Sequence, residues 1–208
     1  LLTVLLSSCF ELDNYDAPNA GINGSLIDNE TGEVVYTEQP DGCRIKLLDL
    51  GYKDPTPLYF WAKADGTFRN VALFSGEYKV APTEGPFFPI TEEVVNLKGV
   101  TDHNFNVTPF LKIKLMEVTP GASGKVTVKF SLKRSATPAG MEIGEKTISE
   151  AWLLCNTTPI VSYYNGGYND KLSVKMDLND TSDEMIESKN QEITLENLQS
   201  GTTYHLRL

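Results

Sequence analysis

Hydrophobic residues recur along the chain in short runs whose spacing favours β-strands over helices. Many runs alternate apolar and polar positions or are rich in β-branched residues, and turns of Gly, Pro, Asn and Asp separate them about every 8 to 15 residues. In the clearest run, residues 125–132, the side chains of Val126, Val128, Phe130 and Leu132 would share one face of a strand. The pattern predicts an all-β protein built from β-sandwiches.

The strand-like runs divide into two groups at Thr108 and Pro109, because proline biases the residue before it away from helix and often ends a strand. Residues 1–19 lack the periodicity: they are first apolar and then acidic. We therefore predict two tandem β-sandwich domains, at residues 20–109 and 110–208, preceded by a separate segment at 1–19.

Turn positions in the first group resemble those of a known module. They are Gly21 and Gly24 followed by Asp28, Thr31-Gly32, Asp65-Gly66-x-Phe68 and Gly76-x-Tyr78-x-Val80. This spacing is similar to that of the carboxypeptidase-regulatory-like domain, a β-sandwich of the transthyretin type. The resemblance implies that the glycines are structural, and it implies no catalytic residue. The Asp65-Gly66 pair is also the preferred pair for a tight hairpin.

The end of the chain resembles the tyrosine corner of a fibronectin type III domain, with the spacing Leu198-x-x-Gly201-x-x-Tyr204. The resemblance implies that Tyr204 begins the penultimate strand, with its ring in the core and its hydroxyl bonded to backbone upstream. One further strand follows in that family. We therefore expect the sequence to be truncated before its last strand; in the alternative, a strand of a partner completes the sheet.

The first residues are typical of the tail of a secretory signal peptide, an apolar run that ends in small residues. The segment Leu6-Ser7-Ser8-Cys9 resembles the lipobox of bacterial lipoproteins, which implies cleavage before Cys9 and lipid attachment to it. A buried strand or helix with an ordinary core cysteine is the alternative. The acidic residues after Cys9 indicate a tether and resemble the surface-export signal of Bacteroidetes lipoproteins. We expect a lipid-anchored outer-membrane protein, displayed at the cell surface.

The lipobox, the transthyretin-like domain and the fibronectin-like domain, taken in this order, resemble a family of Bacteroidetes lipoproteins of unknown function. Members are typically encoded beside starch-utilisation-type outer-membrane transporters and their glycan-binding lipoproteins. The resemblance implies a role in glycan uptake, with that transporter and those lipoproteins as partners. It identifies neither a ligand nor a reaction.

Charge and cysteine usage narrow the picture further. A formal net charge of −10 argues against nucleic acid as a partner, because duplex binding requires cations that neutralise phosphates. The chain has no run of about 18 or more apolar residues that would form a transmembrane helix. Cys43 and Cys155 lie in different halves of the chain. A disulfide between them is possible in an exported protein, but we favour two buried thiols.

Candidate catalytic chemistry is sparse. The chain has only two histidines, His103 and His205, and no nucleophile elbow, zinc-protease motif or phosphate-binding loop. The pairs Glu92-Glu93 and Asp183-Glu184 lie in polar surroundings, where we expect them to be solvated. The acidic residues between 177 and 184 lack the spacing of an EF-hand, although calcium binding remains an alternative for them. We predict no enzyme, no cofactor and no metal site.

The segment 163–170 concentrates the residues that suit carbohydrate. Three tyrosines, two asparagines and an aspartate surround a Gly-Gly turn, and the candidate ligand-binding residues are Tyr163, Tyr164, Asn165, Tyr168, Asn169 and Asp170. Tyrosine offers a flat apolar face with a polar tip at little cost in side-chain entropy. The alternative is a loop whose tyrosines are divided between core and surface. For Trp152 and the aromatic runs 58–61 and 85–89 we expect core packing. The alternative for 58–61 is that at least one aromatic residue is exposed or lies at the domain interface, because alternate residues of a strand face opposite sides.

These observations predict a non-enzymatic cell-surface lipoprotein that binds or presents a polysaccharide or oligosaccharide beside an outer-membrane uptake complex. The alternative of similar weight is a structural spacer or assembly subunit whose partner is a protein. A hydrolase with two unrecognised carboxylates is the third possibility, and it would require those groups to meet in a cleft.

Overall fold

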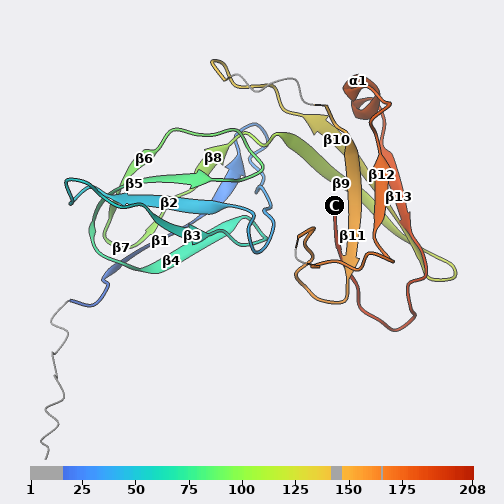
Figure 1. The fold of residues 1–208 in the computed structure, drawn as a ribbon, viewed down its shortest axis with the longest axis horizontal. Helices are drawn as coiled ribbons and strands as arrows, with labels where there is room; N and C mark the ends of the chain where they lie inside the picture. Colours follow the sequence, from blue (N-terminus) through green and yellow to red (C-terminus); the bar gives the residue numbers. More distant parts are fainter. Residues whose placement is uncertain (1–15, 142–146, 165) are drawn as a thin grey trace, which may run out of the picture.

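Two groups of strands bury two separate sets of hydrophobic side chains (Figure 1). The structure is a computed structural model that describes residues 16–141, 147–164 and 166–208. Cys9 therefore lies outside the described residues. The described chain consists of β-strands and one short helix, so the predicted all-β fold class is confirmed.

The first domain packs two sheets face to face. One sheet has the order β4-β1-β7, with β8 pairing the end of β1, and the other has the order β3-β2-β5-β6. Their strands are β1 (Ala20–Asp28), β2 (Arg44–Asp49), β3 (Leu58–Trp61), β4 (Thr67–Leu73), β5 (Gly76–Thr83), β6 (Glu93–Leu97), β7 (Gly99–Asp102) and β8 (Phe105–Val107). Alternate residues point inward, so that Ile22, Ile45, Phe68 and Phe105 are at most 1% exposed.

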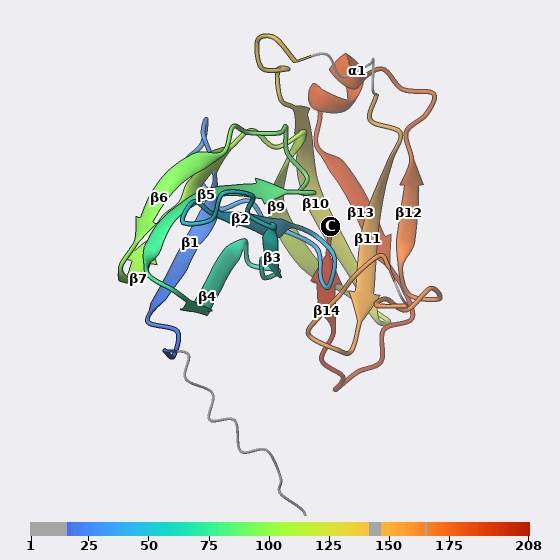
Figure 2. The same cartoon turned by 60° about the vertical axis from the view of Figure 1, so that its left-hand side comes forward.

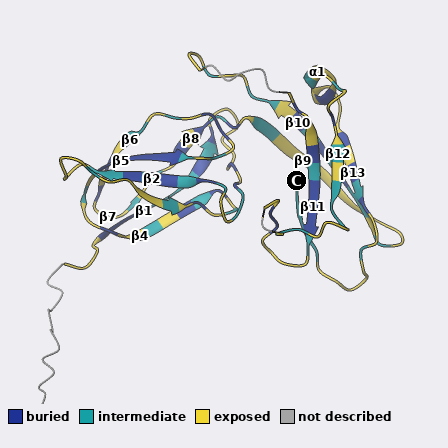
Figure 3. Cartoon of the chain, viewed as in Figure 1, coloured by how far each residue is buried: buried dark blue, intermediate teal, exposed yellow. Residues whose placement is uncertain are grey.

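The second domain also packs two sheets, with the orders β13-β10-β9 and β12-β11-β14. Its elements are β9 (Leu111–Gly121), β10 (Lys125–Arg134), β11 (Glu150–Asn156), β12 (Val174–Asp177), α1 (Asp183–Glu187), β13 (Gln191–Leu195) and β14 (His205–Arg207). Val128, Phe130 and Leu132 of β10 face Leu153 and Cys155 of β11 across the core. The buried positions of both domains are visible in Figure 3.

The edge strand β9 is less covered than the other strands around the second core. Ile113 and Leu115 lie opposite Leu132 and Phe130 in the ladder with β10, so they stand on the core side of the sheet. Nevertheless they are 47% and 58% exposed. The sheet β12-β11-β14 thus covers β10 and β13 but leaves this stretch of β9 open to the groove between the domains.

The glycine of the turn 64–66 is required by both conformation and space. Gly66 has a φ of +73°, and a Cβ there would lie 2.3 Å from the carbonyl oxygen of Val35. Asp65 caps the turn by accepting hydrogen bonds from the backbone N–H and the hydroxyl of Thr67. The strands on either side, β3 and β4, belong to different sheets, so the expected tight hairpin is instead a connection between sheets.

The tyrosine corner is present as the resemblance implied. Tyr204 packs half-buried against the second core, and its hydroxyl accepts a hydrogen bond from the backbone N–H of Gln199 at 3.1 Å. The strand β14 begins one residue later, at His205.

Several residues differ from expectation. Trp152 lies on the outer face of β11, because its neighbours Ala151 and Leu153 occupy the core side. Tyr59 and Trp61 are both 41% exposed, and only Phe60 between them packs on the core. The prediction of core packing was therefore wrong for these three residues. Phe87 and Phe88, by contrast, are buried as expected.

The domains lie side by side (Figure 2), and contacts between residues far apart in sequence hold them together. Phe88 packs against Phe110 with ring centroids 4.9 Å apart. Lys112 at the start of β9 pairs with the carboxylates of Asp28 and Glu30 from the first domain. Asp28 is only 5% exposed, so its charge needs the Lys112 ammonium as a partner.

Both described thiols are free and buried, in agreement with the preference for thiols over a disulfide. No helix among the described residues is long and apolar enough to cross a membrane.

Candidate functional site

Four aromatic side chains gather on the outer face of the sheet β12-β11-β14. Trp152 of β11 lies edge-on to Tyr163 and Tyr168, with ring centroids 5.5 Å and 6.2 Å away. Tyr163 and Tyr168 are nearly parallel, with an interplanar angle of 7°, and Tyr164 meets Tyr163 edge-on at 5.5 Å. Tyr163 and Tyr164 are 45% and 59% exposed. We call Trp152, Tyr163, Tyr164 and Tyr168 the aromatic cluster.

The loop that carries the tyrosines is closed by its own backbone. The N–H of Ser162 donates to the carbonyl of Gly167, and the N–H of Gly167 donates to the carbonyl of Tyr164. Gly167 must be a glycine, because a Cβ would lie 2.7 Å from the Cβ of Ser162. The Gly-Gly pair therefore folds the loop so that tyrosines from both of its arms return to Trp152.

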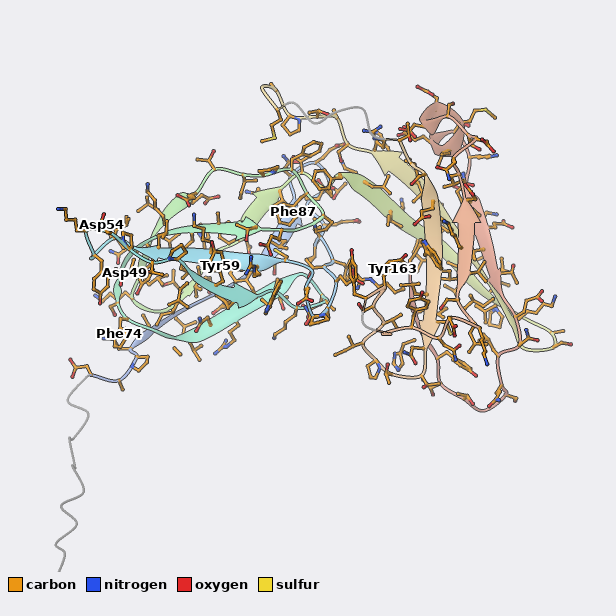
Figure 4. All side chains as sticks on the ribbon, viewed as in Figure 1. Asp49, Asp54, Tyr59, Phe74, Phe87 and Tyr163 are labelled. Carbon is orange, nitrogen blue, oxygen red and sulfur yellow. The ribbon has the colours of Figure 1, made fainter. Side chains whose placement is uncertain are left out.

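A carboxylate from the first domain holds this loop. One oxygen of Glu38 accepts hydrogen bonds from the Ser162 hydroxyl at 2.8 Å and from the backbone N–H of Tyr163 at 2.5 Å. The Ser162 hydroxyl in turn accepts from the N–H of Tyr164 at 3.1 Å. The orientation of the two exposed tyrosines thus depends on both domains. Figure 4 shows Tyr163 on the side of the second domain that faces the first.

An ion pair borders the tryptophan. Glu150 accepts a hydrogen bond from the indole N–H of Trp152 at 2.9 Å and pairs with Lys175 of β12. The Lys175 ammonium lies 5.7 Å from the centroid of the Trp152 ring. The hydrogen bond from Lys175, and next that from Trp152, lowers the pKa of Glu150, so this carboxyl is ionised at neutral pH.

A pocket of about 270 Å³ adjoins the aromatic cluster. Trp152, Tyr163 and Glu150 line it from the second domain, and Glu38 lines it from the first. Arg207 of β14 completes the polar lining, and burial lowers the pKa of its guanidinium, with Glu38 acting in the opposite direction. The pocket therefore combines flat apolar surfaces with carboxylates and cations that can hydrogen-bond hydroxyl groups.

The structure brings some of the candidate ligand-binding residues predicted from the sequence together and leaves others apart. Tyr163, Tyr164 and Tyr168 come together in the aromatic cluster. The side chain of Asn169 accepts from the N–H of Lys171, which is a turn contact, and Asp170 is exposed beyond it. Asn165 lies outside the described residues.

Sequence reasoning missed Trp152, Glu150, Lys175 and Glu38 as members of the site. Strict alternation in the segment 150–156 carried the signal for Trp152, since Ala151, Leu153 and Cys155 already fill the core side. Glu38 had no such signal, because it lies more than 120 residues from Ser162 in the chain.

The candidate catalytic groups occupy structural positions. His103 lies edge-on to Phe105 and 3.1 Å from a Glu93 carboxylate oxygen, and Glu92 pairs with Lys46. Asp183, the first residue of α1, was expected to be solvated but is not. It pairs with Arg134 at 2.8 Å and accepts a hydrogen bond from the backbone N–H of Ile148. Asp177 therefore caps a turn by accepting from the N–H of Asn179, and Asp183 ties the start of α1 to Arg134 and Ile148, while Ser182 is the N-cap of the helix. Within the described residues, no three His, Cys, Asp or Glu side chains gather closely enough to hold a metal ion.

The fold and the site together define a two-core, all-β protein with an exposed aromatic surface. Residues 20–108 match the family described as "Protein of unknown function (DUF3823) N-terminal domain". The match therefore spans the first domain. No curated protein matches the chain.

Three solved structures show the same fold over most of the chain. A DUF3823 family protein from Bacteroides uniformis has a TM-score of 0.77 at 21% identity, covering 91% of this chain and 88% of its own. A second protein from Bacteroides uniformis, described as a "putative carbohydrate binding protein", has a TM-score of 0.73 at 21% identity, with 91% and 87% covered. A DUF3823 family protein from Parabacteroides merdae has a TM-score of 0.66 at 22% identity, with 86% and 81% covered.

Proposed function

We propose that this protein is a non-catalytic carbohydrate-binding protein and that its ligand lies on the aromatic cluster. One observation carries the proposal: Trp152 and three tyrosines stand together on an outer sheet face beside a pocket with a polar lining. Exposed aromatic groups that a folded core does not need mark binding surfaces. The cluster is also held from two sides, by Glu38 and by the ion pair of Glu150 with Lys175.

The chemistry of the site suits a sugar better than a fully apolar ligand. A pyranose ring has an apolar C–H face, which packs on an aromatic ring, and hydroxyl groups at its rim. The carboxylates of Glu38 and Glu150 accept hydrogen bonds from such hydroxyls, and Lys175 and Arg207 donate to them. The fold alone gives no ligand, but the description of one similar Bacteroides uniformis protein as a "putative carbohydrate binding protein" supports this ligand class.

Our proposal includes a location at the outer-membrane surface, with lipid on Cys9 and an uptake transporter and its glycan-binding lipoproteins as neighbours. It is supported by the resemblance of Leu6-Ser7-Ser8-Cys9 to a lipobox. Metabolic labelling with a radioactive fatty acid tests the anchor: label on the wild type and none on Cys9→Ala is the expected result. Equal labelling of both proteins would contradict it.

Retention in native gels that contain neutral polysaccharides tests the binding function. We expect the wild type to be retarded by at least one polysaccharide, and the triple variant Tyr163→Ala, Tyr164→Ala, Tyr168→Ala to bind at least about tenfold more weakly, a loss of about 1.4 kcal/mol. Tyr52→Ala is the matched control, because Tyr52 is 68% exposed and lies in the first domain, outside the cluster. Thermal unfolding of each variant shows that it is folded.

Two results would contradict the proposal. Equal retention of the wild type and the triple variant would show that the ligand lies elsewhere. If no polysaccharide of a broad panel retards the wild type, carbohydrate binding is wrong, and the structural or assembly role becomes the better account.

A further inference from the structure

A second aromatic surface lies on the outer face of the first domain. Tyr59 and Trp61 occupy alternate positions on β3, so both point away from the core, and β3 is the edge strand of its sheet. Each is 41% exposed. They lie opposite Lys46 and Arg44 in the ladder with β2. Figure 4 labels Tyr59 on this face.

A cation and a carboxylate fix the two rings. The central guanidinium carbon of Arg44 lies 4.6 Å from the centroid of the Tyr59 ring and 5.4 Å from that of Trp61. Glu84 pairs with Arg44 from the end of β5, and the backbone of Glu84 is left-handed, with a φ of 59°. This conformation is costly for a residue other than glycine, and it places the carboxylate beside the guanidinium.

Arg44 retains a donor that its neighbours do not use. Its Nε atom is shielded from solvent and has no hydrogen-bond partner among the described residues. Polar atoms in such positions are normally paired, so an unused donor beside two exposed rings needs an explanation. A ligand hydroxyl that approaches over the rings could accept this hydrogen bond after a small movement of the side chain.

The same set of groups therefore occurs twice, once in each domain. The chain has two tryptophans, and both lie outside the cores. Trp61 is accompanied by Tyr59, Arg44 and Glu84. Trp152 is accompanied by Tyr163 and Tyr168, by Lys175 over its ring and by Glu150. Trp61 is 41% exposed and Trp152 is only partly buried, so the chain does not use its two largest apolar side chains to fill a core, and folding alone does not account for the arrangement.

A groove between the domains borders both surfaces. It has a volume of about 1180 Å³ and is lined from the first domain by Glu84 and Asp41 and from the second by Tyr164 and Ile160. Glu84 is the residue that holds Arg44, and Tyr164 belongs to the aromatic cluster. A linear ligand could therefore pass from one surface to the other along the groove.

We propose that Tyr59, Trp61 and Arg44 form a second carbohydrate-binding site, which rests on the proposed function of the aromatic cluster, and that one neutral polysaccharide chain occupies both sites. The ligand is neutral because each cation beside the rings is already paired with a carboxylate: Arg44 with Glu84 and Lys46 with Glu92. A net charge of −10 also disfavours a polyanion. Two linked sites bind a long chain more tightly than a short one, because the second contact is intramolecular.

Calorimetry on the full chain tests the proposal, with a polysaccharide that retards the wild type and a short oligosaccharide cut from it. We expect two oligosaccharides to bind to each wild-type molecule. We expect only one to bind to either of two double variants. The first carries Tyr59→Ala and Trp61→Ala, and the second carries Tyr163→Ala and Tyr164→Ala. Either double variant should bind the intact polysaccharide at least tenfold more weakly. Tyr52→Ala should match the wild type.

Tryptophan fluorescence gives a second reading that does not depend on the alanine variants. In Trp152→Phe the remaining tryptophan is Trp61, and in Trp61→Phe it is Trp152. We expect the oligosaccharide to change the emission of both variants. Phenylalanine retains an aromatic ring, so these proteins should fold even if a double alanine variant does not.

The outcomes separate the two proposals. One oligosaccharide per wild-type molecule, with binding lost in the Tyr163, Tyr164 variant and unchanged emission from Trp61, would overturn the second site and leave the proposed function intact. Binding lost only in the Tyr59, Trp61 variant would support the site on β3 and contradict the aromatic cluster. A wild type that binds no polysaccharide would contradict both.

Discussion

Cys43 shows how burial alone changes the chemistry of one side chain. It lies in the first core with no exposed surface, and burial raises the pKa of its thiol to about 12. Burial also raises the pKa of Cys155 in the second core. Since the thiolate is the reactive form, both residues act as small apolar side chains in the folded protein rather than as nucleophiles.

The raised pKa of Cys43 predicts a loss of stability at alkaline pH. Below about pH 9 the thiol is protonated in both the folded and the unfolded chain, so its full contribution to the free energy of unfolding is present. Between about pH 9 and 12 the unfolded chain loses the proton while the folded protein retains it, and the unfolding free energy falls by up to about 1.4 kcal/mol per pH unit. Urea unfolding of the wild type and of Cys43→Ala between pH 8 and 11 should show that the free energy of unfolding falls more steeply with pH for the wild type. Parallel curves would refute this.

At the scale of elements, the strands were the most predictable part of the chain. Alternation over 125–132 corresponds to β10, whose Val128, Phe130 and Leu132 are buried. Trp152 was misassigned to the core, although alternation within β11 places it on the face opposite to Ala151 and Leu153. For a residue in a two-layer sandwich, the position in the strand decides the side, and hydrophobicity does not.

The loop between β11 and β12 could be predicted only in part. The N–H of Ser162 bonds to the carbonyl of Gly167 within the loop and not to a neighbouring strand. The three tyrosines were identified from composition. Glu38 and the ring geometry were not predictable, because they depend on contacts between distant parts of the sequence.

Glu38 should be a positioning residue for this loop. Glu38→Ala removes the acceptor for Ser162 and for the N–H of Tyr163, and hydrogen bonds to a charged group contribute about 1.5–3 kcal/mol. We expect polysaccharide binding to weaken about tenfold or more and the near-ultraviolet circular dichroism of the Trp152–Tyr163 pair to decrease. Glu38→Gln, which keeps an acceptor oxygen, should restore most of both signals.

Glu77→Ala is the control for the Glu38 experiment, since Glu77 is an exposed glutamate of the first domain that lines neither the pocket nor the groove. It should leave the dichroism and the binding unchanged. A loss of melting temperature in Glu38→Ala with unaltered dichroism and unaltered binding would show that Glu38 only stabilises the fold.

At the scale of the whole molecule, the two domains function as one unit in our proposals. Lys112 pairs with Asp28 and Glu30 near the connection, and Glu38 reaches the loop of the second domain. The tyrosines of the second domain are therefore oriented by a residue of the first domain. The sequence predicted two separate cores, but it contained no sign of these polar links between them.

The position at which β1 begins has a mechanical consequence. The strand β1, which starts at Ala20, begins at the end of the first domain that points away from the second (Figure 1). In our proposal of a lipid on Cys9, the first domain lies between the anchor and the aromatic cluster, so it would act as a spacer that holds Trp152 and its tyrosines away from the bilayer.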